Sequence, residues 1–278
     1  MELPQFSTGD IFAWFLLFMV LGCMTVALIA HALYISQTTP VPEWRPRDSP
    51  IHMLVVLGSG GHTAEMLTLL WHMRINPTRL IYRTYVVTSG DSFSAAKAVE
   101  FESTLSERGA ALDSYSIVTV PRARRVHQSF FTAPFTTLLS FWSCFLVLRG
   151  RHPDQRPLPA VLPSPYPDII FTNGPATAVC VILAAKLLRA YHYCRGFLVP
   201  IRPQSVAGEN VDGRPPVQGK YRLRTIFVES WARVRTLSLS GKILLPLADR
   251  FLVQWPGLSG MRAWPGMKKT EYAGCLVD

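Results

Sequence analysis

A short apolar run that ends in a glycine cluster is the feature that most restricts the fold of this chain. The apolar run is Leu54–Leu57, and Gly58-Ser59-Gly60-Gly61-His62-Thr63 follows it directly. An apolar run of this length, bounded by glycines, is typical of a fully buried parallel strand. From Thr63 onward, apolar residues recur every three or four positions, as they do on one face of a helix. The pattern therefore predicts a strand, a tight turn and a helix whose first turn is capped by Thr63.

This glycine loop is also a candidate anion site. Glycine permits a tight turn and a close approach of backbone and ligand. The free N–H groups and the positive dipole end of the helix would face the loop and suit phosphate or diphosphate. The loop is not a Walker A sequence, and Thr63 occupies the third small position of a dinucleotide fingerprint. A turn without a ligand remains an alternative. His62 can donate to an anion or take a proton near neutral pH, although a lone loop histidine is more often a bystander.

Composition restricts the partners and the compartment. The net charge of +10 favours an anionic partner, which can be nucleic acid, anionic lipid or a phosphorylated substrate. The basic residues are mostly arginines near apolar segments, which argues against nucleic acid. The five cysteines are scattered without CxxC spacing. We therefore expect no metal site, no cofactor and no disulfide framework, and a soluble part that faces a reducing compartment.

The segment Ile11–Tyr34 carries no formally charged residue and is predicted to be a membrane anchor. As a helix it is long enough to cross a hydrocarbon core of about 30 Å. It is longer than the apolar part of a signal peptide, and Glu2 and Asp10 precede it in place of basic residues.

The charges that flank this anchor predict its orientation. Arg45 and Arg47 follow the anchor, whereas no lysine or arginine precedes it. The positive-inside rule then places residues 1–10 in the lumen. It places the linker 35–50 and the domain 51–278 in the cytosol.

A second apolar run, Phe130–Leu148, also lacks formal charges. Predicted strands lie on both sides of it, so a membrane crossing here would divide one sheet between the two sides of a bilayer. Two interpretations remain. The run is either a buried helix of the domain or a helix that lies against the membrane surface. The second is suggested by flanking arginines, namely Arg122, Arg124, Arg125, Arg149 and Arg151.

From residue 51 onward, strand and helix patterns alternate, which predicts an α/β fold with a Rossmann-like parallel sheet covered on both faces. The predicted strands are His52–Leu57, Tyr82–Val87, Ser116–Val120, Asp168–Phe171, Thr225–Val228 and Arg250–Gln254. The predicted helices are Thr63–Ile75, Phe93–Arg108, Phe130–Leu148, Ala176–Arg189 and roughly Thr236–Leu244. Two stretches interrupt the alternation. Residues 151–167 are proline-rich and predicted to form an exposed loop, and residues 203–220 are predicted to be a mobile insert.

Polar or glycine-rich clusters follow most of the predicted strands. Ligands of such sheets bind beyond the carboxyl ends of the strands, so the position of these clusters fits a site, although each can also be an ordinary turn. The clusters are Gly58–Thr63, Thr88–Asp91, Pro121–Arg125, Thr172–Pro175 and Glu229–Ser230. Glu229 ends a strongly apolar strand, and three roles stay open for it: a general base, a ligand of a sugar hydroxyl, or a partner that caps a helix.

Several of these stretches together resemble a known family. The stretches that show this resemblance are Leu57–Met66, Thr172–Pro175, Phe227–Val234 with Leu237–Lys242, and Phe251–Pro256. They resemble the membrane-anchoring, acceptor-side subunit of the two-part UDP-N-acetylglucosamine transferase of N-glycan assembly. The resemblance runs from about residue 50 to the C-terminus, and the predicted anchor agrees with it. The proline-rich loop and the insert at 203–220 match nothing in that family.

The resemblance implies a fold and an activity. The domain would be the N-terminal half of a GT-B glycosyltransferase. A small cytosolic catalytic subunit would supply the half that binds UDP-GlcNAc. The pair would transfer GlcNAc with inversion to dolichyl-diphosphate-GlcNAc on the cytosolic face of the endoplasmic reticulum, and the nuclear envelope is a further location. This chain alone would be inactive. The alternatives are a membrane scaffold with a degenerate site and a membrane-bound oxidoreductase, which the missing third glycine disfavours.

The resemblance also implies roles for individual residues. His62 would act as base or position the acceptor diphosphate, and Glu229 is a second catalytic candidate. The residues expected to bind the acceptor are Gly58, Ser59, Gly60, Gly61, His62, Thr63, Ser89, Asp91, Arg122, Arg124, Arg125, Asn173, Gly174, Glu229 and Ser230. The apolar C-terminal segment is expected either to form a last strand or tucked-in end, or to dock the partner through Tyr272, Leu276 and Val277.

Overall fold

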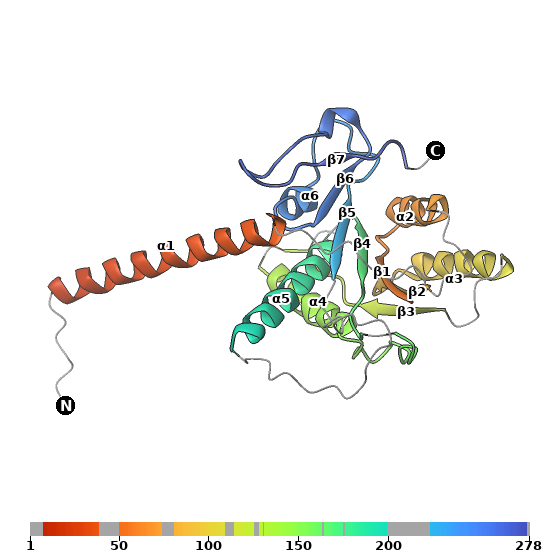
Figure 1. Cartoon of the computed structure of the whole chain (residues 1–278), viewed down its shortest axis with the longest axis horizontal. Helices are drawn as coiled ribbons and strands as arrows, with labels where there is room; N and C mark the ends of the chain where they lie inside the picture. The colour runs from red at the N-terminus through yellow and green to blue at the C-terminus, as the bar shows by residue number, and fades with distance from the viewer. Residues whose placement is uncertain are drawn as a thin grey trace, which may run out of the picture.

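A computed structural model (Figure 1) describes residues 8–38, 50–73, 81–108, 114–124, 128–129, 131–162, 164–174, 176–198 and 223–276. It consists of a long helix, α1 (Thr8–Thr38), that leads away from one α/β domain. The predicted site residues Arg125 and Val277, and the insert at 203–220, lie outside the described residues.

The domain is built on one parallel sheet of seven strands, which confirms the predicted fold class. The strands are β1 (Ile51–Val56), β2 (Ile81–Thr88), β3 (Tyr115–Val120), β4 (Ile169–Asn173), β5 (Arg224–Val228), β6 (Arg250–Val253) and β7 (Glu271–Tyr272). Their order across the sheet is β3-β2-β1-β4-β5-β6-β7. All the strands point the same way, but β2 and β3 are added on one side of β1, whereas β5, β6 and β7 are added beyond β4 on the other side. All the carboxyl ends therefore meet at one rim, with the change of direction between β1 and β4.

Helices cover both faces of the sheet (Figure 1). Those helices are α2 (Gly61–His72) and α3 (Ser92–Glu107) on one face, and α4 (Ala133–Leu148) and α5 (Ala176–Leu198) on the other. Alternation along β1 divides the core: Leu54 and Val56 pack with α4 and α5, whereas Met53, Val55 and Leu57 pack with α2 and α3. The short helix α6 (Leu239–Leu244) and the 3-10 turn η1 (Pro256–Leu258) flank the β5–β6 end.

Two predicted element starts were wrong for identifiable reasons. The predicted helix Thr236–Leu244 is shorter, because Ser238 is its N-cap and its hydroxyl accepts from the Gly241 N–H at 2.9 Å. The predicted helix Phe130–Leu148 begins at Ala133, with Pro134 in the first turn, where a missing N–H costs nothing.

Two strand predictions were also incomplete. Strand β4 runs two residues beyond the predicted end, because Thr172 and Asn173 still pair with β5. The six predicted strands did not include β7, which pairs with β6 through only two residues, although a last strand in the C-terminal segment was one of the two alternatives left open there. Polar residues at a strand end and a two-residue edge strand both leave little signal in an apolar pattern.

Helix α1 is long and apolar enough to cross a membrane over Phe12–Tyr34, where mean hydropathy is 2.5 and no residue is buried. Its last turn meets the domain. Gln37 is fully buried, and its Nε2 donates to the Leu245 carbonyl at 3.2 Å. Its Oε1 accepts from the Lys268 N–H at 3.1 Å. The base of the apolar helix is thus fixed to the C-terminal part of the domain.

The second apolar run belongs to the domain. It lies between β3 and β4, which are strands of the same sheet, so α4 does not carry the chain across a membrane. The proline-rich stretch 151–167 contains no helix or strand in its described residues, as predicted for a loop.

His52, on β1, is a buried histidine away from the rim. Its Nε2 lies 2.9 Å from the Thr84 hydroxyl, and its backbone N–H donates to Asp168 Oδ2 at 2.9 Å. The Tyr82 ring packs edge-on against it. Burial lowers the pKa of His52 to about 4, although the nearby Asp168 carboxylate opposes the shift. The folded domain therefore holds His52 neutral.

We expect His52 to make the domain sensitive to acid. A histidine with a lowered folded-state pKa stabilises the fold above its unfolded-state pKa near 6.5, and loses this contribution as the pH falls toward 4. From pH 7 to pH 5, the free energy of unfolding should fall by about 2 kcal/mol for this reason. Urea unfolding of the detergent-solubilised chain should show it, and His52→Gln should remove that part of the pH dependence. An identical pH dependence in both proteins would contradict this assignment.

Candidate functional site

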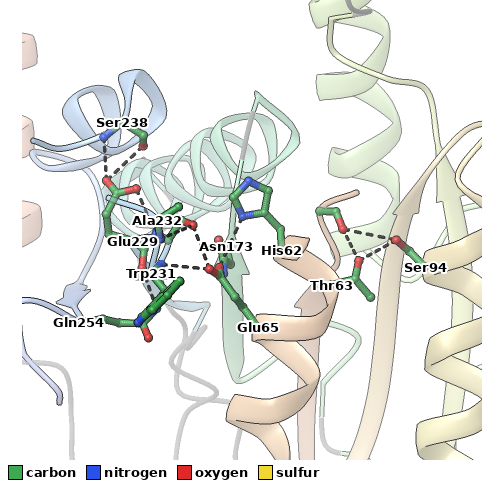
Figure 2. A network of polar contacts seen from close by, with 12 residues as sticks. His62, Thr63, Glu65, Ser94, Asn173, Glu229, Trp231, Ala232, Ser238 and Gln254 are labelled. Atoms are coloured by element: carbon green, nitrogen blue, oxygen red, sulfur yellow. Dashed lines mark hydrogen bonds and ion pairs between the residues drawn. The ribbon is translucent and has the colours of Figure 1, made fainter. Parts of the chain in front are cut away.

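The rim between β1 and β4 brings together residues from three strand ends (Figure 2). His62 and Glu65 lie in the first turns of α2, after β1. Asn173 ends β4, and Ser230 follows β5. In parallel sheets of this kind, the crevice outside the strand ends at the change of direction is where ligands bind. The arrangement therefore places these four side chains at the expected ligand position.

His62 and Gly174 are in close contact. A Cβ atom at Gly174 would lie 3.0 Å from His62 Cγ and 3.1 Å from Cδ2, and Gly174 has φ of +87°. Both the space and the backbone conformation therefore require glycine here. The imidazole of His62 packs against the turn after β4, and its side chain remains about one-third exposed.

Glu65 joins the three strand ends. Its Oε1 accepts from the Ser230 hydroxyl at 2.9 Å and from the Trp231 N–H at 3.0 Å. Its Oε2 accepts from Asn173 Nδ2 at 2.6 Å and lies 3.5 Å from His62 Nδ1. One carboxylate thus receives donors from the loops after β4 and β5 while it faces the histidine of its own helix.

The electrostatics of this cluster keep Glu65 ionised. Burial on its own would raise the pKa of the Glu65 carboxyl, but the contacts from His62, Asn173 and Ser230 outweigh burial and hold the pKa below its usual value. Asn173 is buried, and its Oδ1 has no hydrogen-bond partner among the described residues. A buried acceptor of this kind, beside a partly exposed imidazole, is suited to a donor group of a ligand.

Glu229 has the contacts of a helix-capping partner. Its Oε2 accepts from the N–H and the hydroxyl of Ser238 at 3.0 and 3.1 Å, and its Oε1 accepts from the Ser230 N–H at 3.2 Å. A Cβ atom at Gly241 would come within 2.2 Å of Oε2. Of the three roles left open by the sequence, these contacts match the third, since the carboxylate is buried against the start of α6.

The glycine loop differs from the prediction in one respect. Gly60, with φ of +64°, occupies the N-cap of α2 without a side-chain bond, so the prediction that Thr63 caps this helix was wrong. Thr63 is buried inside the first turn and donates to the Gly58 carbonyl, and its hydroxyl lies 2.6 Å from Ser94 Oγ. Thr63 therefore fixes the shape of the loop, and Ser59, Gly60 and Gly61 form its exposed outer part.

The rim beyond β2 and β3 holds the remaining candidates. Asp91 is buried and caps α3, accepting from the Ser94 N–H at 3.1 Å. Ser89 is exposed, and its carbonyl accepts from Arg122 Nε at 2.9 Å. Arg124 is exposed. Arg122 and Arg124 make this part of the rim cationic. The carboxylate of Asp91 is used to cap α3.

The structure thus places the predicted residues in two groups. His62, Asn173, Gly174 and Ser230 gather at the β1/β4 crevice, while Ser89, Arg122 and Arg124 lie toward the β3 edge. Glu65 was missed as a site residue, although its position three residues after His62 puts both on the same side of α2.

The C-terminal segment is a sheet strand with a tucked-in end. Strand β7 pairs with β6, and the Leu276 N–H donates to Gln254 Oε1 at 3.2 Å. Gln254 in turn donates to the Glu229 carbonyl at 3.1 Å. The Tyr272 side chain is half exposed on this edge strand.

Comparison with known proteins gives one consistent family. Residues 53–276 match the family model described as Oligosaccharide biosynthesis protein Alg14 like. The chain is 55% identical over 231 residues to the UDP-N-acetylglucosamine transferase subunit alg14 of Aspergillus fumigatus, covering 77% of this chain and 100% of that protein. It is 34% identical over 258 residues to subunit ALG14 of Homo sapiens, covering 92% and 95%. No solved structure matches the chain.

We expect Glu65→Ala to lower the free energy of unfolding by about 2 to 4 kcal/mol, because buried donors on Asn173 and Ser230 would lose their acceptor. The matched control is Glu100→Ala on α3, whose exposed ion pair with Lys97 is worth below about 0.5 kcal/mol. Urea unfolding of both variants is the measurement. Equal effects of the two substitutions would show that Glu65 does not hold the strand ends together.

Proposed function

Because the chain belongs to the Alg14 family, we propose that it is the membrane-anchored, acceptor-side subunit of a UDP-N-acetylglucosamine transferase. The observation that carries this proposal is the intact contact of His62 with Gly174 and Glu65 at the β1/β4 crevice. A domain retained only for recruitment has no need to keep that crevice assembled. The apolar helix α1 supports attachment to a membrane.

The proposed reaction transfers GlcNAc from UDP-GlcNAc to dolichyl-diphosphate-GlcNAc. The 4-hydroxyl of the acceptor sugar attacks the anomeric carbon with inversion, the bond from that carbon to UDP breaks, and the hydroxyl proton passes to a base. UDP leaves with the bonding electron pair. Such a transfer needs a base for the hydroxyl and stabilisation of the charge on UDP. The product is a β1,4-linked chitobiosyl lipid.

In this proposal the acceptor lies over the β1/β4 crevice. The exposed glycine loop and the start of α2 would face the diphosphate, and Arg122 and Arg124 would add positive charge along the rim. His62 would contact the acceptor, either at its diphosphate or at the attacking hydroxyl. The buried Asn173 Oδ1 would accept from a sugar hydroxyl.

A second polypeptide would complete the enzyme. One seven-stranded sheet forms one Rossmann-like domain, which is half of a GT-B transferase, so a small cytosolic subunit would bind UDP-GlcNAc opposite the rim. The chain alone would then be inactive. Its anchor would place the domain on the cytosolic face of the endoplasmic reticulum.

A transfer assay tests the whole proposal. The substrates are UDP-GlcNAc and dolichyl-diphosphate-GlcNAc, given to this chain alone, to the donor-binding subunit alone, and to both together. We expect the chitobiosyl lipid only from the pair. Product from this chain in isolation would contradict the division into halves, and no product from the pair would reject the reaction.

His62→Ala should reduce turnover of the pair about 100-fold or more if the imidazole contacts the reacting acceptor. The matched control is His72→Ala, an exposed histidine in the last turn of the same helix. It should leave turnover unchanged. If the His62 variant still recruits the partner and retains normal turnover, the chain is a scaffold and its crevice has no role in transfer.

The exposed edge at Tyr272 is the proposed partner contact. Tyr272→Glu should abolish co-purification of the donor-binding subunit, because a carboxylate would enter an apolar interface. Val99→Glu, at an exposed apolar residue in the middle of α3 and away from the rim, is the control and should leave co-purification intact. Recovery of the partner with the Tyr272 variant would place the contact elsewhere.

A further inference from the structure

Helix α4, together with Phe131 in the turn before it, exposes a row of large apolar side chains. We name this row the α4 stripe: Phe131, Phe135, Leu138, Leu139 and Trp142, with 90%, 73%, 66%, 61% and 58% of each exposed. Residues 135, 138, 139 and 142 recur at the spacing of one helix face. Single exposed apolar residues are ordinary on soluble proteins, but a contiguous row of large ones marks an interaction surface.

The opposite face of α4 already forms part of the core. Ser140, Ser143, Cys144, Val147 and Leu148 are buried there against the sheet and α5. The helix is therefore held to the domain by one face while the other projects outward. Helix α5, which packs against α4, also exposes Leu183, Leu187 and Tyr191.

The charges around the α4 stripe identify the chemistry of its partner. The sequence of α4 contains no charged residue, and Arg149 follows its last turn with its guanidinium over the Phe145 ring. Arg151 and Arg124 are also exposed near its two ends. A helix with an apolar outer face and basic flanks matches the surface of a bilayer that contains anionic lipid. Trp142, stacked on Phe145, is the residue type enriched at membrane interfaces.

The arrangement of the domain brings this face toward the membrane. In Figure 1, α1 leads away from the side of the sheet that α4 and α5 cover, and α2 and α3 lie on the far side. The buried Gln37 ties the base of α1 to Leu245, at the end of α6, and this end packs against α5. The helix that would cross the bilayer is therefore attached on the side of the sheet that α4 and α5 cover. The donor-binding subunit, by contrast, has to face the strand ends.

We propose that the α4 stripe lies in the headgroup region of the same bilayer that α1 crosses. This rests on the membrane attachment in the proposed function, but not on the transfer reaction. The contact would give the domain a second point of attachment. The rim would then be held next to the surface where a lipid-linked acceptor has its diphosphate.

Photocrosslinking to lipid tests this contact in the full-length chain. The photoreactive residue p-benzoylphenylalanine replaces Leu139 in one variant and Phe135 in a second. It replaces Val20 of α1 as a marker of the span, and Val99 of α3 as a matched exposed control. Each variant is reconstituted in vesicles of phosphatidylcholine and phosphatidylserine and irradiated. Mass spectrometry then measures the fraction that carries one phospholipid.

We expect lipid adducts at Leu139 and Phe135 at least about tenfold above Val99. Adducts to a second copy of the chain or to protein, or labelling at the level of Val99, would overturn the proposal. Labelling at Val20 reports on the anchor separately. Since the assay needs neither donor nor partner, the α4 contact and the transferase proposal succeed or fail independently.

Discussion

The carboxylate of Glu65 is the interaction on which the geometry of the rim depends. Three segments that are far apart in sequence meet there, because Asn173, Ser230 and the Trp231 N–H all donate to its two oxygens. The same carboxylate lies beside His62, whose ring packs against Gly174. The loops after β1, β4 and β5 are therefore positioned by one partly buried carboxylate, and the imidazole is held at the crevice as a consequence. A substitution that disturbed any of these three loops would move the histidine.

The division of the molecule into faces follows from the order of the strands. With β1 and β4 at the centre, the rim loops open at one end of the sheet, α2 and α3 cover one face, and α4 and α5 cover the other. The rim and the α4 stripe are thus separate surfaces of one rigid domain. Under the proposed function, this separation lets the domain touch the bilayer with one surface and receive the donor-binding subunit at another.

The sequence was sufficient for the fold class and for most elements, because buried parallel strands such as Leu54–Leu57 are short apolar runs bounded by glycine and polar residues. It was insufficient where a side chain has a role set by distant partners. Thr63 is a residue type that often caps helices. Because α2 begins earlier, at the glycines, its hydroxyl instead hydrogen-bonds to Gly58 and Ser94. In the sequence, Glu65 looks like an ordinary surface residue of a helix. Only the meeting of the β4 and β5 loops with α2 shows that it is their shared acceptor. For Phe130–Leu148, a buried helix and a helix against the membrane surface both stayed open, since an apolar helix without charges does not indicate which face the sheet covers.

The acid–base chemistry that transfer requires is restricted by how this rim uses its carboxylates. Asp91 caps α3, and Glu229 is buried against the start of α6, so both are occupied by backbone donors and hydroxyls. Glu65 is nearer to His62, but its lowered pKa makes it a weak base, because a carboxylate stabilised by several donors holds a proton poorly. Among the described residues at the rim, His62 is then the remaining candidate for the base. Under the proposed function, if the attacking hydroxyl is not deprotonated by His62, a base on the donor-binding subunit is the alternative. In that case the contribution of this chain would be to hold the acceptor in the orientation that the other half of the enzyme requires.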